Sequence, residues 1–319
     1  MPDRSRFFVL ARFIVFARLL PCLWLAIAGN TVLAADKLLV VASFSILADL
    51  TQRIGGERLQ VHTLVGPGTD AHVYQPTPAD ARTLSKARLV IVNGLGFEGW
   101  IERLVKSAGY RGNIIVASQG IIPLRLAAPT KEHLLSPTEH AHADNLDPHA
   151  WQDLGNARRY VDNITSALCE IDPTNKMVFQ ANAARLRDEM SALDRQIRTT
   201  FNSIPAERRK VISSHDAFNY FARAYGIRFI APVGINTDAD PSAATVGAII
   251  RQIRQEKIKV LFVENITDPR LLERISRESG ARLGGTLYSD SLAKPGSPAD
   301  SYLGMISHNA KTLAGALID

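Results

Sequence analysis

The chain has 319 residues and a formal net charge of +6 at pH 7, and 46% of its residues are hydrophobic. This length is sufficient for two domains, each with a hydrophobic core of its own. The positive charge is small and scattered along the sequence, which argues against nucleic acid or a membrane surface as the partner.

The first 34 residues have the layout of a secretory signal peptide, in which positive charge precedes a short apolar run and a small residue. The apolar run from Leu19 to Ala28 is too short to span a membrane. We expect cleavage after Ala34 or Ala35 and export to the periplasm. Cys22 is a candidate for a lipid anchor, but Pro21 stands where a small residue would precede such a cysteine. The positive charges are those of Arg4, Arg6, Arg12 and Arg18.

Removal of this segment leaves 33 basic and 30 acidic residues, a net charge of +3. Cys169 is then the one remaining cysteine, which excludes an intramolecular disulfide although the compartment is oxidising. A lone cysteine also excludes a zinc site built from clustered thiolates. Any metal in this protein is therefore expected to be held by histidine and carboxylate side chains.

Strands and helices alternate in the first half of the mature chain. An apolar segment at 37–42 predicts a buried strand, and the pattern after it predicts a helix that ends at Gly55. Thr77 and Asp80 predict the start of another helix, with Pro78 at a tolerated first-turn position. This alternation is typical of a parallel sheet with helices on both faces. Further strands are expected at 59–65, 88–92 and 113–117.

Two helices, at 154–171 and 173–204, are predicted in the middle of the chain. The second has one apolar stripe formed by Val178, Leu186, Met190, Leu193, Ile197 and Phe201. Such a helix is on the order of 45 Å long, more than the width of a small lobe, so we expect it to link two lobes as a strut. A second α/β unit follows it, with strands near 210–212, 228–231, 259–263 and 285–288.

The predicted fold class is α/β, with two lobes that each contain a small parallel sheet flanked by helices and that are joined by one long rigid backbone helix. The two lobes look like one architecture used twice. The predicted organisation is a signal peptide at 1–34, an N-terminal lobe at 35–172 with a histidine-containing loop at 131–146, a linking helix at 173–204 and a C-terminal lobe at 205–319.

Four potential metal ligands stand out by their position in this scheme. His72, His215 and Asp290 each follow a predicted strand, and His149 ends the connection out of the first sheet. Ligands of open α/β sheets bind beyond the carboxyl ends of the strands, so two facing lobes would direct all four side chains into one cleft. Three imidazoles and one carboxylate suit zinc and are acceptable to manganese or iron. Taken singly, each residue also has an ordinary explanation as a helix cap or a turn residue.

Three of the eight histidines of the chain lie between His140 and Trp151, and His133 lies just upstream. The turn at Asp147 and the anchoring aromatic ring of Trp151 are expected to hold His149 in place. His133, His140 and His142 have no such support. They are either accessory ligands that capture metal or part of a solvated polar loop.

The segment 94–99 contains the glycine spacing of dinucleotide-binding folds. The acidic residue that would bind the ribose is missing, because no Asp or Glu occurs between Glu102 and Glu132. The simpler interpretation is a glycine turn that packs Trp100 beneath the next helix. Glu264, at another strand end, is interpreted as a partner in a structural salt bridge rather than as a general base.

Six segments occur in order along the mature chain: VASFSILAD from Val41, VGPGTDAHVYQPTP from Val65, NGLGFEGW from Asn93, DPHAW from Asp147, SHDAF from Ser214 and LYSD from Leu287. In this combination they resemble the metal-binding receptors of bacterial ABC importers, the zinc and manganese solute-binding proteins of the ZnuA/TroA type. The resemblance covers nearly the whole mature chain.

The resemblance implies that the first lobe supplies His72 and His149 and that the second supplies His215 and Asp290. Members selective for manganese usually have glutamate where this chain has His215, so a third imidazole favours zinc. The expected function is a periplasmic, high-affinity zinc receptor that delivers Zn²⁺ to an ABC permease. The alternative within this class is a receptor for manganese, or for zinc, manganese and iron together. A zinc chaperone or surface adhesin is a weaker alternative.

The protein is expected to be a monomer without enzymatic activity, and a periplasmic metal chaperone is a further candidate partner. A secreted zinc hydrolase is the rival class, with Glu264 or Asp216 as its base. Four protein ligands argue against it, because they leave no open position for a substrate. The zinc branch of the family often carries a long loop rich in histidine and acidic residues, which is reduced here to 131–146.

Overall fold

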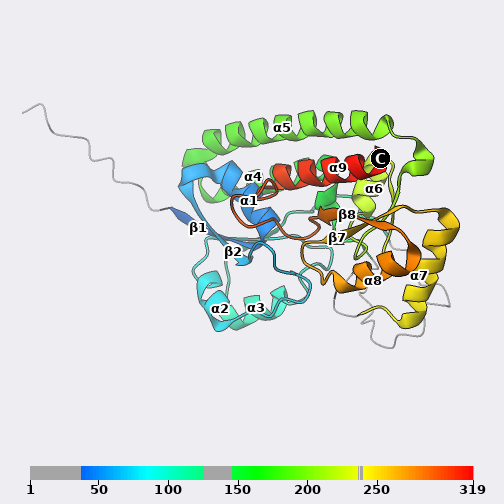
Figure 1. The fold of residues 1–319 in the computed structure, drawn as a ribbon. Helices are drawn as coiled ribbons and strands as arrows, with labels where there is room; N and C mark the ends of the chain where they lie inside the picture. The colour runs from blue at the N-terminus through cyan, green and yellow to red at the C-terminus, as the bar shows by residue number, and fades with distance from the viewer. Residues whose placement is uncertain (1–36, 126–145, 236, 238–239, 319) are drawn as a thin grey trace, which may run out of the picture. The chain divides into compact units, whose positions relative to one another are not determined.

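The computed structural model describes residues 37–125, 146–235, 237 and 240–318. Among the residues that it describes, two four-stranded sheets are present, and every strand pairing within them is parallel (Figure 1). The strand orders are β2-β1-β3-β4 and β6-β5-β7-β8, so the same topology is used twice, as expected. The first sheet consists of β1 (Leu38–Phe44), β2 (Leu59–Val65), β3 (Leu89–Val92) and β4 (Asn113–Val116). The second consists of β5 (Lys210–Ile212), β6 (Arg228–Ile230), β7 (Val260–Glu264) and β8 (Arg282–Leu287).

Local sequence signals explain where several helices begin. The hydroxyl of Thr77 accepts a hydrogen bond from the backbone N–H of Asp80, and the Asp80 carboxylate accepts one from the N–H of Thr77, which makes a capping box. Ser242 caps a later helix through the N–H of Thr245. The helices are α1 (Ser45–Gly55), α2 (Pro78–Leu84), α3 (Ile101–Ala108), α4 (Leu154–Ile171), α5 (Lys176–Asn202), α6 (Asn219–Tyr225), α7 (Ala243–Glu256), α8 (Arg270–Ser279) and α9 (Tyr302–Ile318).

The long helix α5 links the two lobes. Its 27 residues span about 40 Å, and it packs against α1 and α4 of the first lobe and against α6 and α9 of the second (Figure 1). It begins at Lys176 because Pro173 opens a separate 3-10 turn, Pro173–Asn175. The two-lobed fold with a long linking helix is therefore confirmed.

The predicted apolar stripe of α5 was wrong at its first member. Val178 is 43% exposed, whereas the neighbouring Phe179 is fully buried. One residue corresponds to a rotation of about 100° around a helix, so the two side chains face different surroundings. The buried residues of α5 are Phe179, Ala183, Leu186, Met190, Ile197 and Phe201.

The main hydrophobic core is continuous between the lobes. It includes Val41 and Phe97 from the first lobe and Phe218 and Phe262 from the second. A smaller cluster fills the space between α7, α8 and the second sheet. Within the described ranges, no helix has the length and apolar character needed to cross a membrane.

Candidate metal centre

His72 lies in the loop that follows β2. The carboxylate of Asp70 accepts a hydrogen bond of 2.8 Å from the backbone N–H of His72, which holds the backbone of His72 in place. The imidazole packs edge-on against the ring of Phe97, at 4.8 Å between ring centres, and its side chain is 3% exposed. Trp100, at the glycine turn, donates its indole N–H to the carbonyl of Ala71 and so supports this loop.

The glycine turn before Trp100 is structural, as the simpler interpretation proposed. Trp100 is buried, and the carboxylate of Glu98 accepts hydrogen bonds from Ser43 and from the backbone N–H of Asn93. Gly94 has a φ of +83°, which glycine adopts without strain. This segment therefore places Phe97 against the imidazole of His72.

His149 is held by its own motif. One oxygen of Asp147 accepts hydrogen bonds from both the backbone N–H and Nδ1 of His149, at 2.9 and 2.8 Å. The ring also packs edge-on against Trp151, whose indole N–H donates to the carbonyl of Ser289 in the second lobe. Because Nδ1 is engaged with Asp147, the free lone pair of the neutral ring is on Nε2.

His215 follows β5 and is held in the same way by Glu264 at the end of β7. The two Glu264 oxygens lie 2.8 Å from the backbone nitrogen of His215 and 2.6 Å from its Nδ1. Both side chains are fully buried. The salt bridge expected for Glu264 is thus made with His215, and it directs Nε2 away from β7.

Asp290 follows β8 and completes the group. Its side chain is fully buried, and neither carboxylate oxygen has a hydrogen-bond partner of good geometry among the described residues. One oxygen lies 3.2 Å from Nε2 of His72 and 3.2 Å from Nε2 of His215, and the other lies 3.5 Å from Nε2 of His149. A buried carboxylate in this setting is costly unless a positive charge faces it.

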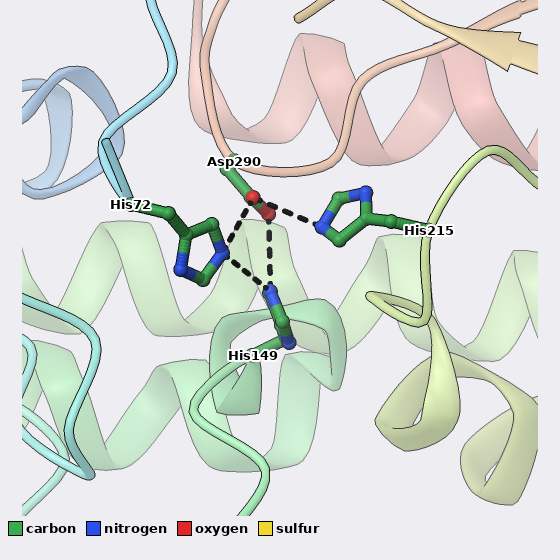
Figure 2. A group of neighbouring side chains, drawn as sticks. All are labelled: His72, His149, His215 and Asp290. Atoms are coloured by element: carbon green, nitrogen blue, oxygen red, sulfur yellow. Dashed lines mark hydrogen bonds and ion pairs between the residues drawn. The ribbon is translucent and has the colours of Figure 1, made fainter. Parts of the chain in front are cut away.

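The structure brings together the four residues that the sequence singled out (Figure 2). One ligand atom from each lies within 4.8 Å of the others, and the His72 and His149 Nε2 atoms are 3.3 Å apart. A zinc ion with ligands at about 2.0–2.1 Å in a tetrahedron separates those ligands by about 3.3–3.4 Å. The donor set therefore fits a divalent cation, and the separations between 3.2 and 3.5 Å given above are close to those of a tetrahedral site. His133, His140 and His142 lie outside the described residues.

The charged groups of the cluster shift one another's pKa values. Burial opposes protonation of His149, but Asp290 and Asp147 outweigh it and raise the pKa of His149 to about 9. The pKa of His215 is raised well above its usual value, again against burial, by the two carboxylates that contact it. Burial alone would raise the pKa of Asp290, yet the neighbouring imidazolium groups hold it well below its ordinary range. Positive charge on two imidazoles thus offsets part of the negative charge of the buried carboxylates.

His72 behaves differently from the other two histidines. Burial lowers its pKa, and Asp290 compensates only in part. The ring is therefore neutral at pH 7 and can donate a lone pair to a cation without first losing a proton.

Sequence reasoning missed the pairing of Asp147 and Glu264 with the ligand histidines. It interpreted Asp147 as a turn residue, and it did not name a partner for Glu264. Such carboxylates fix the ring orientation and raise the basicity of a ligand histidine. A signal for Asp147 was available, because it stands two residues before His149. Glu264 is 49 residues from His215, so its role depends on the fold.

The family model described as ZnuA, zinc-uptake complex component A, periplasmic, matches residues 40–316. The manganese ABC transporter substrate-binding lipoprotein PsaA of Streptococcus pneumoniae is 34% identical over 290 residues, which cover 89% of this chain and 90% of that protein. The metal ABC transporter substrate-binding lipoprotein FimA of Streptococcus parasanguinis is 32% identical over 295 residues, with 91% and 92% covered.

Solved structures show the same fold. The periplasmic zinc-binding protein TroA from Treponema pallidum has a TM-score of 0.80 at 28% identity and covers 88% of this chain and 99% of its own. The Mn-bound periplasmic metal-binding protein from Candidatus Liberibacter asiaticus has a TM-score of 0.76 at 30% identity, with 88% and 100% covered. These proteins are receptors rather than enzymes, which excludes the secreted hydrolase. The chain belongs to the ZnuA family, the metal-binding periplasmic receptors of ABC importers.

Proposed function

We propose that this receptor binds Zn²⁺ through His72, His149, His215 and Asp290 and delivers it to the permease of an ABC importer. The observation that carries the proposal is the donor set itself: three Nε2 atoms and one carboxylate, which lie within 4.8 Å of one another in the interior of the protein. Four protein ligands complete a zinc coordination shell. They leave no position for a reactive water, which suits capture and release of an ion.

The neighbouring carboxylates support this assignment. Asp147 and Glu264 contact the Nδ1 atoms of His149 and His215, so that both Nε2 atoms face Asp290. Loss of such supporting contacts in metal sites costs about 10- to 100-fold in affinity. The site is therefore built around imidazole nitrogen, the donor type that zinc accepts readily.

Manganese is the second candidate, because several relatives, PsaA among them, are named as manganese receptors. Manganese prefers carboxylate, carbonyl and water oxygen, whereas this site offers one carboxylate and three imidazoles. Among divalent first-row metals, manganese also binds a given nitrogen and oxygen site less tightly than zinc. The donor chemistry thus favours zinc, and the names of the relatives favour manganese.

Titration of the mature protein with zinc and manganese in competition tests the proposal. We expect one zinc per chain, measured by elemental mass spectrometry after desalting, and no displacement of zinc by roughly a hundredfold excess of manganese. Retention of manganese at equal concentrations of the two metals would assign the receptor to manganese. Absence of any stoichiometric metal would refute the four-residue site.

Replacing His215 by glutamate is expected to reduce the preference for zinc, but only together with a second change. The new carboxylate would lie beside Glu264, whose Oε2 is 2.6 Å from Nδ1 of His215, and like charges at that distance repel. We expect His215→Glu alone to bind both metals poorly. The double variant with Glu264→Gln should bind manganese again, with the zinc-to-manganese affinity ratio reduced by roughly tenfold or more.

Isothermal titration of the single variant, the double variant and Glu264→Gln with each metal measures this effect. Glu264→Gln alone is the matched control, because it removes the charge beside His215 and keeps all three imidazoles. An affinity ratio that is the same in the double variant and in Glu264→Gln would show that residue 215 does not decide the choice of metal.

The remaining features of the proposal concern export and organisation. We propose that residues 1–34 are removed on export and that the receptor is a monomer. We also propose that the lobes are bounded at 35–172 and 205–319, with the linking segment 173–204, which contains α5, between them. The relatives PsaA and FimA are named as lipoproteins, so a lipid anchor at Cys22 is the alternative. An accessory role in metal capture is proposed for His133, His140 and His142.

A further inference from the structure

The loop that carries His72 is hydrogen-bonded directly to the loop that carries Asp290. The backbone N–H of Gly68 donates to the hydroxyl of Ser291 at 2.8 Å and to the carbonyl of Leu292 at 3.1 Å. Gly68 lies four residues before His72, and Ser291 directly follows Asp290. These bonds therefore join the two lobes beside the metal ligands.

The turn at 66–69 explains why a hydroxyl fits at this point. Thr69 donates its backbone N–H to the carbonyl of Gly66, and Gly68 has a φ of +74°, as the third position of a type II turn requires. The turn presents the Gly68 N–H and the Gly66 carbonyl to Ser291, at 2.8 and 3.4 Å. A hydroxyl can accept the first bond and donate the second, which no apolar side chain can do.

Ser45 extends this contact into the first lobe. Its hydroxyl accepts a hydrogen bond of 3.0 Å from the backbone N–H of Leu292 and lies 3.4 Å from the hydroxyl of Ser291. Ser45 and Ser291 are 4% and 1% exposed. Water is therefore a poor substitute for either partner, and loss of one hydroxyl leaves buried polar groups unpaired.

We propose that Ser291 is a positioning residue for cargo binding, which fixes the separation between His72 and Asp290 across the two lobes. The inference rests on the proposed function, in which these two side chains share one cation. The Nε2 of His72 lies 3.2 Å from the nearer oxygen of Asp290. Since both ligand loops meet at the Ser291 hydroxyl, this spacing is set before the cation arrives and costs less to maintain on binding.

Replacing Ser291 by alanine tests this role. We expect the zinc dissociation constant to rise about five- to tenfold, the factor that corresponds to loss of one net hydrogen bond, with a faster zinc dissociation rate. Ser289→Ala is the matched control. Ser289 is equally buried two residues away, its hydroxyl has no hydrogen-bond partner in the described part of the chain, and alanine keeps its carbonyl. We expect wild-type zinc affinity for this control.

A double-mutant cycle separates positioning of His72 from a general loss of structure. If Ser291 acts by placing His72, the Ser291→Ala change should have little further effect on zinc affinity in a His72→Ala background. A general effect on the fold would lower affinity by the same factor in both backgrounds. Ser45→Ala probes the same contact from the first lobe and should show a smaller effect in the same direction, even where Ser291→Ala fails to fold.

Two outcomes overturn the proposal, and they are distinguishable. If wild-type protein bound no zinc, the receptor function would fail and the positioning role with it. If wild-type protein bound zinc and Ser291→Ala matched Ser289→Ala, or if the loss persisted in full without His72, the site would stand and only the role of Ser291 would fall. The supporting result is a loss specific to Ser291 that disappears with His72.

Discussion

Replacing His149 by alanine is expected to weaken zinc binding by roughly 100- to 1000-fold. Structural zinc sites bind with about 10–16 kcal/mol, so one of four ligands accounts for about 2.5–4 kcal/mol. The substitution also removes the Nδ1 partner of Asp147, whose side chain is fully buried. A buried carboxylate that loses a partner destabilises the surrounding structure. The melting temperature of the metal-free variant should therefore fall as well.

Competition with a chromophoric chelator of known zinc affinity measures the loss. The matched control is His62→Ala, because His62 is a partly buried histidine of β2 that is not part of the four-residue cluster. We expect wild-type affinity for that variant. Equal zinc affinities for His149→Ala and His62→Ala would place the metal elsewhere in the protein.

Raising the pH from 6.5 to 9 is expected to destabilise the metal-free protein while it strengthens zinc binding. The folded-state pKa of His149 is raised from 6.5 to about 9, so the protonated ring stabilises the fold fully below pH 6.5. That contribution is lost as the pH rises through about 9. It amounts to on the order of 3 kcal/mol, since one pKa unit corresponds to about 1.4 kcal/mol.

Zinc affinity should change in the opposite direction over the same range, because the cation has to displace protons from His149 and His215. For each histidine that must lose a proton, the apparent zinc affinity rises by up to about tenfold for every unit of pH increase below the pKa of that histidine. Thermal unfolding in the presence of chelator and zinc competition in matched buffers measure the two trends. A metal-free protein that was equally stable at pH 6.5 and pH 9 would contradict the paired charges of the site.

Much of the fold was predicted from the periodicity of apolar residues and from residues typical of helix ends. The helix at Leu154–Ile171 and the strand at Leu59–Val65 have the predicted bounds, because apolar spacing and flanking turns define them locally. The last strand begins at Arg282, three residues before the predicted start, where half-exposed residues gave no apolar signal. The stripe of α5 was misplaced at Val178, since the eight-residue step to Leu186 turns Val178 about 80° away from the stripe, whereas the seven-residue step from Phe179 keeps that ring on it.

The four candidate ligands were predicted from the sequence, whereas most of the contacts that hold them in position were not. His72, His215 and Asp290 were recognisable because each follows a strand, and the family resemblance added the grouping. Glu264 and Ser291 contact residues far away in the sequence, so their roles depend on how the lobes pack.

The shared core has a consequence for the order in which the chain folds. The last helix returns to the first lobe, where the backbone N–H of Tyr302 donates to Asp49 and its hydroxyl donates to the carbonyl of Trp151. A chain without its C-terminal segment therefore lacks part of the packing of its first lobe. Asp290 also lies in the late part of the sequence. The four-residue cluster can thus form only after the C-terminal segment has folded against the first lobe, so that the cluster reports completion of the whole fold.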